Sequence, residues 1–274
     1  MTDWQLTGSA PIELSAARRE LHAAVQVVSS AGRALLPARA DHSHTSLTWS
    51  DDLGGFLGEP LPPDQLRAGL DVTCLALCVV ERDGRRTAEL ALEGQWLPDA
   101  TAWLSRQLAK RLGGDVQIPP AELPDALAAE RGPHSPFQRH AAAAELARYY
   151  SNASHVLMEW STASTPIRTW PHHFDIAVLL PGPRDGLTIG TGMSPGDGSY
   201  GAPYWYVTPW PYPPANALAP LSDGGTWHTA GWIGAVLTGM RLRHDGAAEQ
   251  RDQVAGFIRG AVAASRAALG GAPE

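Results

Sequence analysis

Two histidines and one aspartate are the residues of this sequence whose types and spacing best suit chemistry. His173 and Asp175 stand two apart in the segment PHHFD, and side chains two apart on a β-strand point to the same face. His228 follows in GGTWHT. Two imidazoles and a carboxylate can bind one side of an Fe or Zn ion and leave positions open for a substrate. The pattern therefore predicts that His173, Asp175 and His228 act as metal ligands or as catalytic acid/base groups.

A structural role explains the same residues, and both interpretations stay open. Asp175 can pair with Arg168 or cap a nearby helix. His228 is the second residue of WHTAGWIGAVLTGMRLRH. The apolar spacing of this segment predicts a helix from about Thr229 to Leu242. A histidine at a helix N-terminus suits a general base as well as a metal ligand, so this position does not distinguish between them.

The densest aromatic stretch, SPGDGSYGAPYWYVTPWPYP, follows the histidine pair. Tyrosine and tryptophan combine apolar area with a hydrogen-bonding group, which suits a small-molecule pocket or a protein interface. Strand alternation puts Tyr204 and Tyr206 on one face and Trp205 on the other, and core packing is the alternative for each ring. The residues predicted to bind a ligand are His172, Arg168, Asp197, Tyr204, Trp205 and Tyr206.

Amphipathic helices and short strands must position these groups. Apolar spacing predicts helices over 13–36, 97–112, 141–160 and 247–269, in addition to the one after His228. Strands are predicted over 42–49, 70–81 and 87–93, and the Asp83-Gly84 turn joins the last two. The region 115–136 is rich in proline and lacks periodicity, which is typical of a linker.

The order of predicted elements occurs twice, which indicates an internal duplication. A constant offset of 129 residues relates Pro37, Arg39 and His44 to Pro166, Arg168 and His173. The predicted fold is α+β, with two pseudo-symmetric α-β-β-β-α repeats packed as one globular unit. Polar residues found only in the second repeat are the better functional candidates. The predicted boundaries are 1–114 for the first repeat, 115–138 for the linker, 139–246 for the second repeat with the candidate site, and 247–274 for a C-terminal helix and tail.

Composition favours a globular protein without a nucleic-acid or membrane partner. Of the 274 residues, 44% are hydrophobic and 18% are charged, and the net charge is −7, so neither disorder nor a basic nucleic-acid-binding surface is expected. The first ten residues lack the pattern of a signal peptide, and no apolar run is long enough for a membrane span. Cys74 and Cys78 are expected to be buried free thiols in a reducing cytoplasm. The Ala, Arg, Gly and Pro bias is typical of a GC-rich bacterial genome.

Three blocks, PHHFDIA, GMSPGDGSYGAPYWYVTPWPYP and GGTWHTAGW, together resemble an uncharacterised bacterial family of unknown function. The resemblance extends to LLPARADHSHTSLTW in the first half and so covers most of the chain. It implies no activity.

The function therefore has to be inferred from the residues alone. Two hypotheses are considered, an enzyme and a non-catalytic protein. The first is an enzyme that acts on a small molecule at the His/Asp site, with a divalent metal. The alternative is a non-catalytic protein with structural histidines, which either holds a small-molecule ligand among the aromatic rings or uses them as a homodimer or partner surface.

Overall fold

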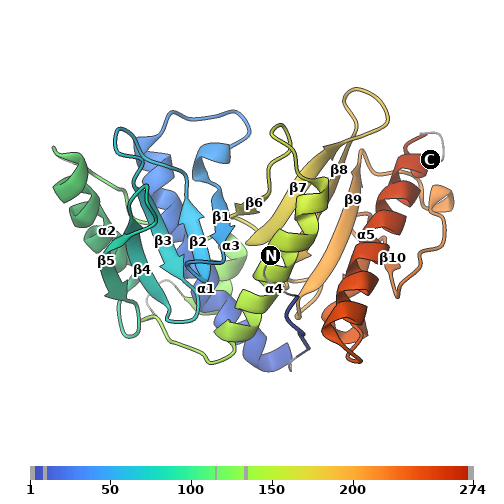
Figure 1. Cartoon of the computed structure of the whole chain (residues 1–274), viewed down its shortest axis with the longest axis horizontal. Helices are drawn as coiled ribbons and strands as arrows, with labels where there is room; N and C mark the ends of the chain where they lie inside the picture. Colours follow the sequence, from blue (N-terminus) through green and yellow to red (C-terminus); the bar gives the residue numbers. More distant parts are fainter. Residues whose placement is uncertain (1–3, 9–10, 115, 133–134, 271–274) are drawn as a thin grey trace. The chain divides into compact units, whose positions relative to one another are not determined.

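The computed structural model describes the chain except residues 1–3, 9–10, 115, 133–134 and 271–274, and except the side chains of residues 11–13. Within the described residues it combines five α-helices with eleven strands, all of whose reported pairings are antiparallel (Figure 1). This confirms the α+β class. The helices are α1 (Pro11–Leu35), α2 (Leu97–Leu112), α3 (Asp125–Arg131), α4 (Ala143–Leu157) and α5 (Ala247–Ala268). The strands are β1 (Leu47–Ser50), β2 (Gly55–Gly58), β3 (Arg67–Asp71), β4 (Ala76–Val80), β5 (Arg86–Ala91), β6 (Arg168–Trp170), β7 (Asp175–Pro181), β8 (Thr188–Ser194), β9 (Tyr204–Trp210), β10 (Thr226–His228) and β11 (Gly234–Thr238).

The chain divides into two compact units, each made of segments that are distant in sequence. Unit 1 comprises the described residues of Met1–Ile12, Arg148–Ile167 and Asp175–Glu274. Unit 2 comprises those of Glu13–Ala147 and Arg168–Phe174. The predicted domain boundaries follow the chain order instead, and they stay a prediction.

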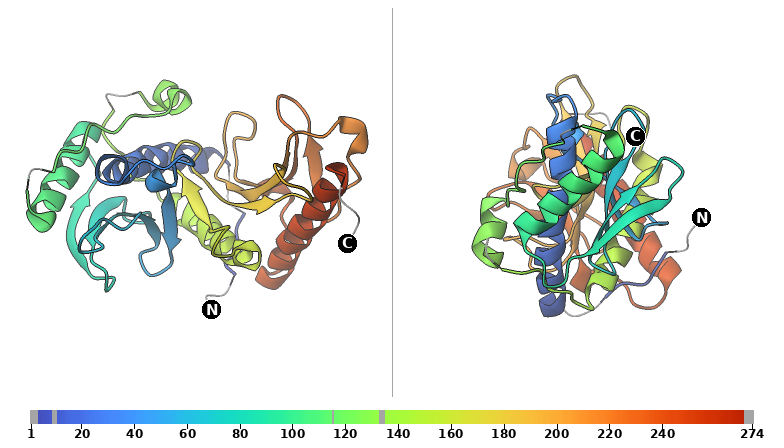
Figure 2. Two further views of the ribbon diagram at one scale, coloured as in Figure 1. Left: turned by 90° about the horizontal axis from the view of Figure 1, so that it is seen from above. Right: turned by 90° about the vertical axis from the view of Figure 1, so that its left-hand side faces the viewer.

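Unit 2 is a sheet in the order β6-β1-β2-β3-β4-β5, with α1 and α2 along one face (Figure 2). The register aligns Phe56, Leu70 and Leu77 across β2, β3 and β4, and all three are fully buried. Gly32 of α1 allows close approach of the segment before β1, since a Cβ there would collide with the His44 carbonyl oxygen. Alternating apolar residues of the strands therefore meet the apolar side of the helices in one core.

Unit 1 is a sheet in the order β7-β8-β9-β11-β10, and α5 lies along one of its faces (Figure 2). Trp205 of β9 and Phe257 of α5 are each 1% exposed and belong to its core. The ring of Trp205 stacks on Trp4 at 5.9 Å between centroids. The second face of this sheet carries the tyrosines of β9.

The N-terminal segment 4–8 is held against the helices of unit 1 by two buried amides. Gln250 of α5 accepts hydrogen bonds from Trp4 Nε1, Thr7 N and Thr7 Oγ1, each at 3.0 Å, and donates to the Thr7 carbonyl at 2.9 Å. Asn152 of α4 exchanges two bonds with the backbone of Gln5. Both amide side chains are 0% exposed, so their loss would leave buried polar groups without partners.

Two predicted elements are wrong, each for a local physical reason. The predicted helix 229–242 is instead a turn, β11 and a short 3-10 helix, because Gly231 adopts a φ of 86° and the glycines around it weaken a helix. The predicted strand 70–81 is the hairpin β3–β4, because the Asp71 carboxylate accepts bonds from Thr73 Oγ1 and Cys74 N and so forms a turn. The predicted linker contains α3.

The predicted duplication is not confirmed. Each unit contains helices and an antiparallel sheet, but the offset of 129 aligns α2 with the strands β10 and β11. The predicted burial of the two cysteines is confirmed for Cys78 in β4 but is wrong for Cys74, which lies exposed in the β3–β4 turn; both are free thiols. The predicted helices 97–112 and 247–269 agree closely with α2 and α5.

Substituting Gln250 by Ala is expected to destabilise the protein by about 2–4 kcal/mol, because several buried donors and acceptors of the N-terminal segment lose their partner. Urea unfolding at neutral pH measures the change. Gln253→Ala is the matched control, since this glutamine lies one turn further along α5 and is only partly buried. Equal losses in the two variants would show that the N-terminal segment does not depend on Gln250.

Candidate functional site

One face of the unit 1 sheet gathers most of the predicted site residues of the second half. Tyr206 lies opposite Gly192 of β8 and Val236 of β11, and residues opposite one another in antiparallel strands share a face. Asp175 and Tyr204 lie on this face by the same register, as does His228 in β10. Trp205 points to the opposite face, where α5 packs, so core packing accounts for it.

Two tyrosine–aspartate hydrogen bonds organise this face, which we call the tyrosine face (Asp175, Asp197, Tyr200, Tyr204, Tyr206 and His228). The Tyr206 hydroxyl donates to Asp175 Oδ2. The Tyr204 hydroxyl donates to Asp197 Oδ2 at 2.5 Å. Asp197 Oδ1 accepts from the backbone N–H groups of Ser199 and Tyr200, which fixes the turn that carries Tyr200. Each carboxylate thus holds one phenol ring in a defined orientation.

His228 is engaged through both ring nitrogens. Nε2 lies 2.7 Å from the Ala230 carbonyl oxygen, which can only accept, so Nε2 carries a proton. Nδ1 lies 3.0 Å from the Tyr200 hydroxyl and accepts from it when the imidazole is neutral. The ring also stacks on Trp232 at 4.3 Å. This imidazole therefore holds Tyr200 and Trp232 in place.

The phenols of the tyrosine face stay protonated at neutral pH. Burial raises the pKa of Tyr200, Tyr204 and Tyr206 above the usual 10. For Tyr204 a hydrogen bond to Asp197 raises the pKa further, and for Tyr206 the charge of Asp175 does so. A phenol with a raised pKa does not serve as a base or nucleophile, so the hydroxyls act as hydrogen-bonding groups.

The tyrosine face is uncovered at Gly190. Gly190 of β8 lies opposite Thr208 of β9, and a Cβ there would meet only the Thr208 carbonyl oxygen, at 3.9 Å. Leu179 and Trp210, which flank this position, are 59% and 56% exposed. The outer part of the face is therefore open and partly apolar.

The predicted metal set is not brought together by the structure. His173 belongs to unit 2, whereas Asp175 and His228 belong to unit 1. Among the described residues, no group of three His, Cys, Asp or Glu side chains is arranged to hold a metal ion. Metal binding at these residues stays a prediction.

In unit 2, His172 and His173 belong to a larger group of imidazoles that includes His22 of α1. Their rings lie 4.3 Å apart, and both residues are exposed. Burial lowers the pKa of His172 to about 4, and the charges of His173 and His42 contribute. Because solvent screens an exposed group, this shift carries little stability.

His22 is the half-buried member of this group. Its Nε2 donates to the Pro171 carbonyl oxygen at 2.8 Å, and its ring stacks on Phe174 at 5.2 Å. Burial lowers its pKa from 6.5 to about 4; the Pro171 bond raises it, and the charges of Arg18, His173 and His172 lower it. The sequence offered no signal for His22 beyond its place on a predicted helix.

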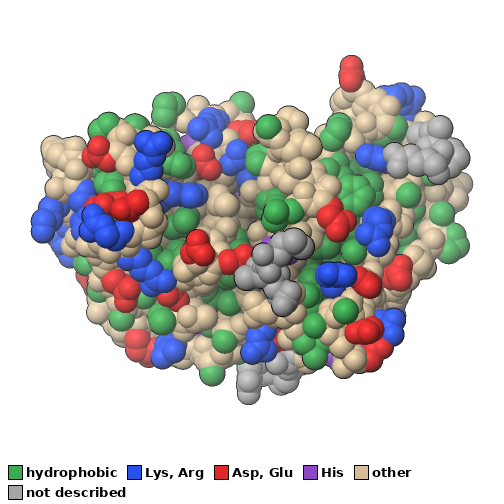
Figure 3. Space-filling view, viewed as in Figure 1, with side chains coloured by type: hydrophobic (Ala, Val, Ile, Leu, Met, Phe, Trp, Pro, Cys, Tyr) green, Lys and Arg blue, Asp and Glu red, His purple; other side chains and the backbone are tan. Residues whose placement is uncertain are grey.

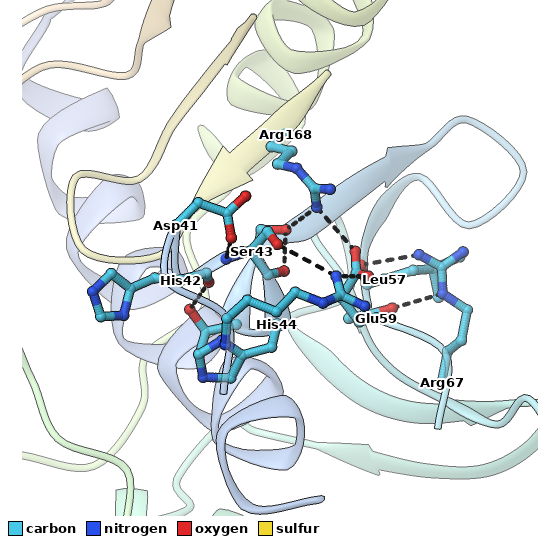
Figure 4. A network of polar contacts seen from close by, with 12 residues as sticks. Asp41, His42, Ser43, His44, Leu57, Glu59, Arg67 and Arg168 are labelled. Carbon is cyan, nitrogen blue, oxygen red and sulfur yellow. Dashed lines mark hydrogen bonds and ion pairs between the residues drawn. The ribbon is translucent and has the colours of Figure 1, made fainter. Parts of the chain in front are cut away.

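Arg168 lies in a polar network of unit 2 rather than beside Asp175 (Figure 4). Its Nη1 donates to Ser46 Oγ at 2.7 Å and to Glu59 Oε1 at 3.2 Å. Arg39, its counterpart by the predicted offset, donates to the second oxygen of the same carboxylate at 3.3 Å. The two arginines of the P-x-R-x4-H pattern therefore meet at Glu59, which the sequence analysis did not single out.

Comparison with known proteins identifies no relative: no protein-family model, curated protein or solved structure matches the chain. Among the described helices, none combines the length and apolarity needed to cross a bilayer. On the face shown in Figure 3, basic and acidic side chains are interspersed in both units. The site is therefore interpreted from its own geometry.

The depressed pKa of His22 predicts loss of stability in mild acid. The unfolded chain takes up a proton near pH 6.5, whereas the folded protein resists it until about pH 4, so the stabilising effect is complete above pH 6.5 and is lost as pH falls toward 4. The slope contributed by one such group is at most about 1.4 kcal/mol per pH unit. Urea unfolding across this range measures it.

His22→Gln separates this effect from general acid denaturation. The Gln amide keeps a donor for the Pro171 carbonyl but does not titrate, so the variant should show a shallower decline between pH 6.5 and 4. His140→Gln, in unit 2 but outside this group, should decline as the wild type does. If His22→Gln and the wild type have the same slope, the His22 imidazole is not the cause.

Proposed function

We propose that the protein is a small-molecule-binding protein whose tyrosine face holds a ligand with a cationic amine. The observation that carries this proposal is the pair of tyrosine–carboxylate hydrogen bonds on one sheet face, Tyr206–Asp175 and Tyr204–Asp197. Cations are bound by carboxylates and by the faces of aromatic rings. Both kinds of group are present here within one unit.

The arrangement of the rings supports an aromatic site. The centroids of Tyr200 and Tyr204 lie 4.9 Å apart with planes at 50°, and those of Tyr204 and Tyr206 lie 6.2 Å apart at 54°. Rings tilted in this way present faces as well as edges. A hydroxyl that donates to a carboxylate becomes a better acceptor, so each phenol oxygen can also receive an N–H group of the ligand.

Binding is better supported than catalysis. The three phenols are held protonated by burial, and both nitrogens of His228 already have partners. The predicted catalytic set of His173, Asp175 and His228 stays a hypothesis, as does the use of the rings as a homodimer surface.

Isothermal titration calorimetry with ethylammonium and choline tests the proposal, with 3,3-dimethyl-1-butanol as the neutral isostere of choline. Saturable binding is expected for a cation and not for the isostere. Asp175→Asn keeps an acceptor for Tyr206 but removes the charge, and affinity should fall about tenfold or more.

Asp185→Asn is the matched control, since this residue is exposed in the β7–β8 loop of the same unit. It removes the same charge outside the tyrosine face and should leave affinity unchanged. The proposal is wrong if neither cation binds saturably, or if the neutral isostere binds as tightly as choline.

A further inference from the structure

Unit 2 contains a cluster of three arginines around one carboxylate, at a distance in sequence from the tyrosine face. Glu59 accepts from Arg39 at 3.3 Å and from Arg168 at 3.2 Å. The charge of Glu59 also acts on Arg67, whose guanidinium donates to the carbonyls of Gly58 and Leu57 (Figure 4). Asp41 adds a second carboxylate whose charge acts on Arg168. Three guanidiniums thus face two carboxylates, which leaves an excess positive charge.

The guanidiniums of Arg39 and Arg168 are oriented by hydrogen bonds, but these bonds do not use all of their N–H donors. Each uses only Nη1 in its bonds to Glu59 and to the serine hydroxyls of Ser43 and Ser46. Within the described part of the chain, Nε and Nη2 of both arginines make no hydrogen bond. A guanidinium has five N–H donors in a fixed fork, so each of these two keeps a pair of donors that suits two oxygens of one anion.

The cluster is accessible to solvent on one side. The side chain of Arg39 is 50% exposed, whereas those of Arg168 and Glu59 are 22% and 17% exposed. Ser43 and Ser46 are buried, and their hydroxyls accept hydrogen bonds from Arg39 and Arg168. These bonds fix the guanidiniums on the side away from solvent. A surface hollow of about 500 Å³ meets the cluster at Arg67, and Leu57, Pro60 and Arg82 are among its other lining residues.

We infer that Arg39 and Arg168 form a binding site for an oxyanion, either a phosphoryl or a carboxylate group of a small molecule. Bidentate pairing with such groups is the characteristic interaction of arginine. Glu59 holds the two guanidiniums together through Nη1 of each, and its negative charge opposes that of a bound anion. This site is independent of the amine proposed for unit 1.

Titration with inorganic phosphate at constant ionic strength tests this site, with acetate in parallel. Saturable binding of either anion is expected, and the tighter of the two identifies the phosphoryl or the carboxylate class. Arg39→Gln should weaken binding about tenfold or more, since one charge-assisted pair is lost. Arg106→Gln, an exposed arginine of α2 in the same unit that lies outside the cluster and the hollow, should bind as the wild type does.

Glu59→Gln gives the sharpest result because its expected effect has the opposite sign. Removing the opposing charge should strengthen anion binding about threefold to tenfold while the amide still accepts a hydrogen bond. Circular dichroism confirms that each variant is folded. Absence of saturable binding of phosphate and acetate to both the wild type and Glu59→Gln overturns the inference, as does equal weakening by Arg106→Gln and Arg39→Gln.

Discussion

The rest of the structure depends on the position of Phe174, where the chain leaves unit 2 and begins β7 of unit 1. Its side chain is 0% exposed and packs against His22 and Phe56 at 5.2 and 5.4 Å between ring centroids. Its φ is 58°, a left-handed conformation that bulky residues rarely adopt and that costs about 1–3 kcal/mol. The buried ring offsets this cost. The result is that His172 and His173 stay with unit 2, while Asp175 begins the tyrosine face.

Because the chain passes from one unit to the other at Phe174 and at earlier points, neither unit is a continuous piece of chain. Unit 1 requires the N-terminal segment that Gln250 holds, and the pair Thr7–Gln250 is separated by 243 residues. Unit 2 requires β6, which pairs with β1 through Leu47 and Thr169. Contacts this distant close long loops, at a cost in chain entropy. Polar side chains such as the buried Gln250 and the half-buried Arg168 therefore specify the arrangement as much as the apolar cores stabilise it.

Local patterns in the sequence were sufficient for local structure. The helix 97–112 was predicted with the bounds of α2, and the Asp83-Gly84 turn does join β4 to β5, since Glu81 and Gly84 share a hydrogen bond. Alternation also put Tyr204 and Tyr206 on the face opposite Trp205. Alternation over 70–81 wrongly predicted one continuous strand. The β3–β4 turn has no glycine to mark it, and Leu75 adopts the positive φ there.

Long-range partners could not be predicted in this way. Arg168 and Glu59 are 109 residues apart, and no periodicity connects them. The sequence placed His22 on a helix but did not predict its lowered pKa. That pKa depends on contacts with Pro171 and Phe174, which belong to a distant segment. Grouping His173 with Asp175 stays a prediction: a spacing of two residues implies one continuous strand, whereas the left-handed Phe174 lies between them.

Both proposed sites follow from one physical arrangement. In each, a carboxylate orients neighbouring side chains without using all of their capacity to bind a ligand. In unit 1, Asp175 and Asp197 orient phenol rings whose oxygens and faces still attract a cation. In unit 2, Glu59 orients two guanidiniums whose remaining N–H donors still attract an anion. Groups fixed in this way lose little conformational entropy when a ligand arrives. This pre-organisation, together with phenols kept protonated by burial, favours recognition of small charged molecules over acid–base catalysis.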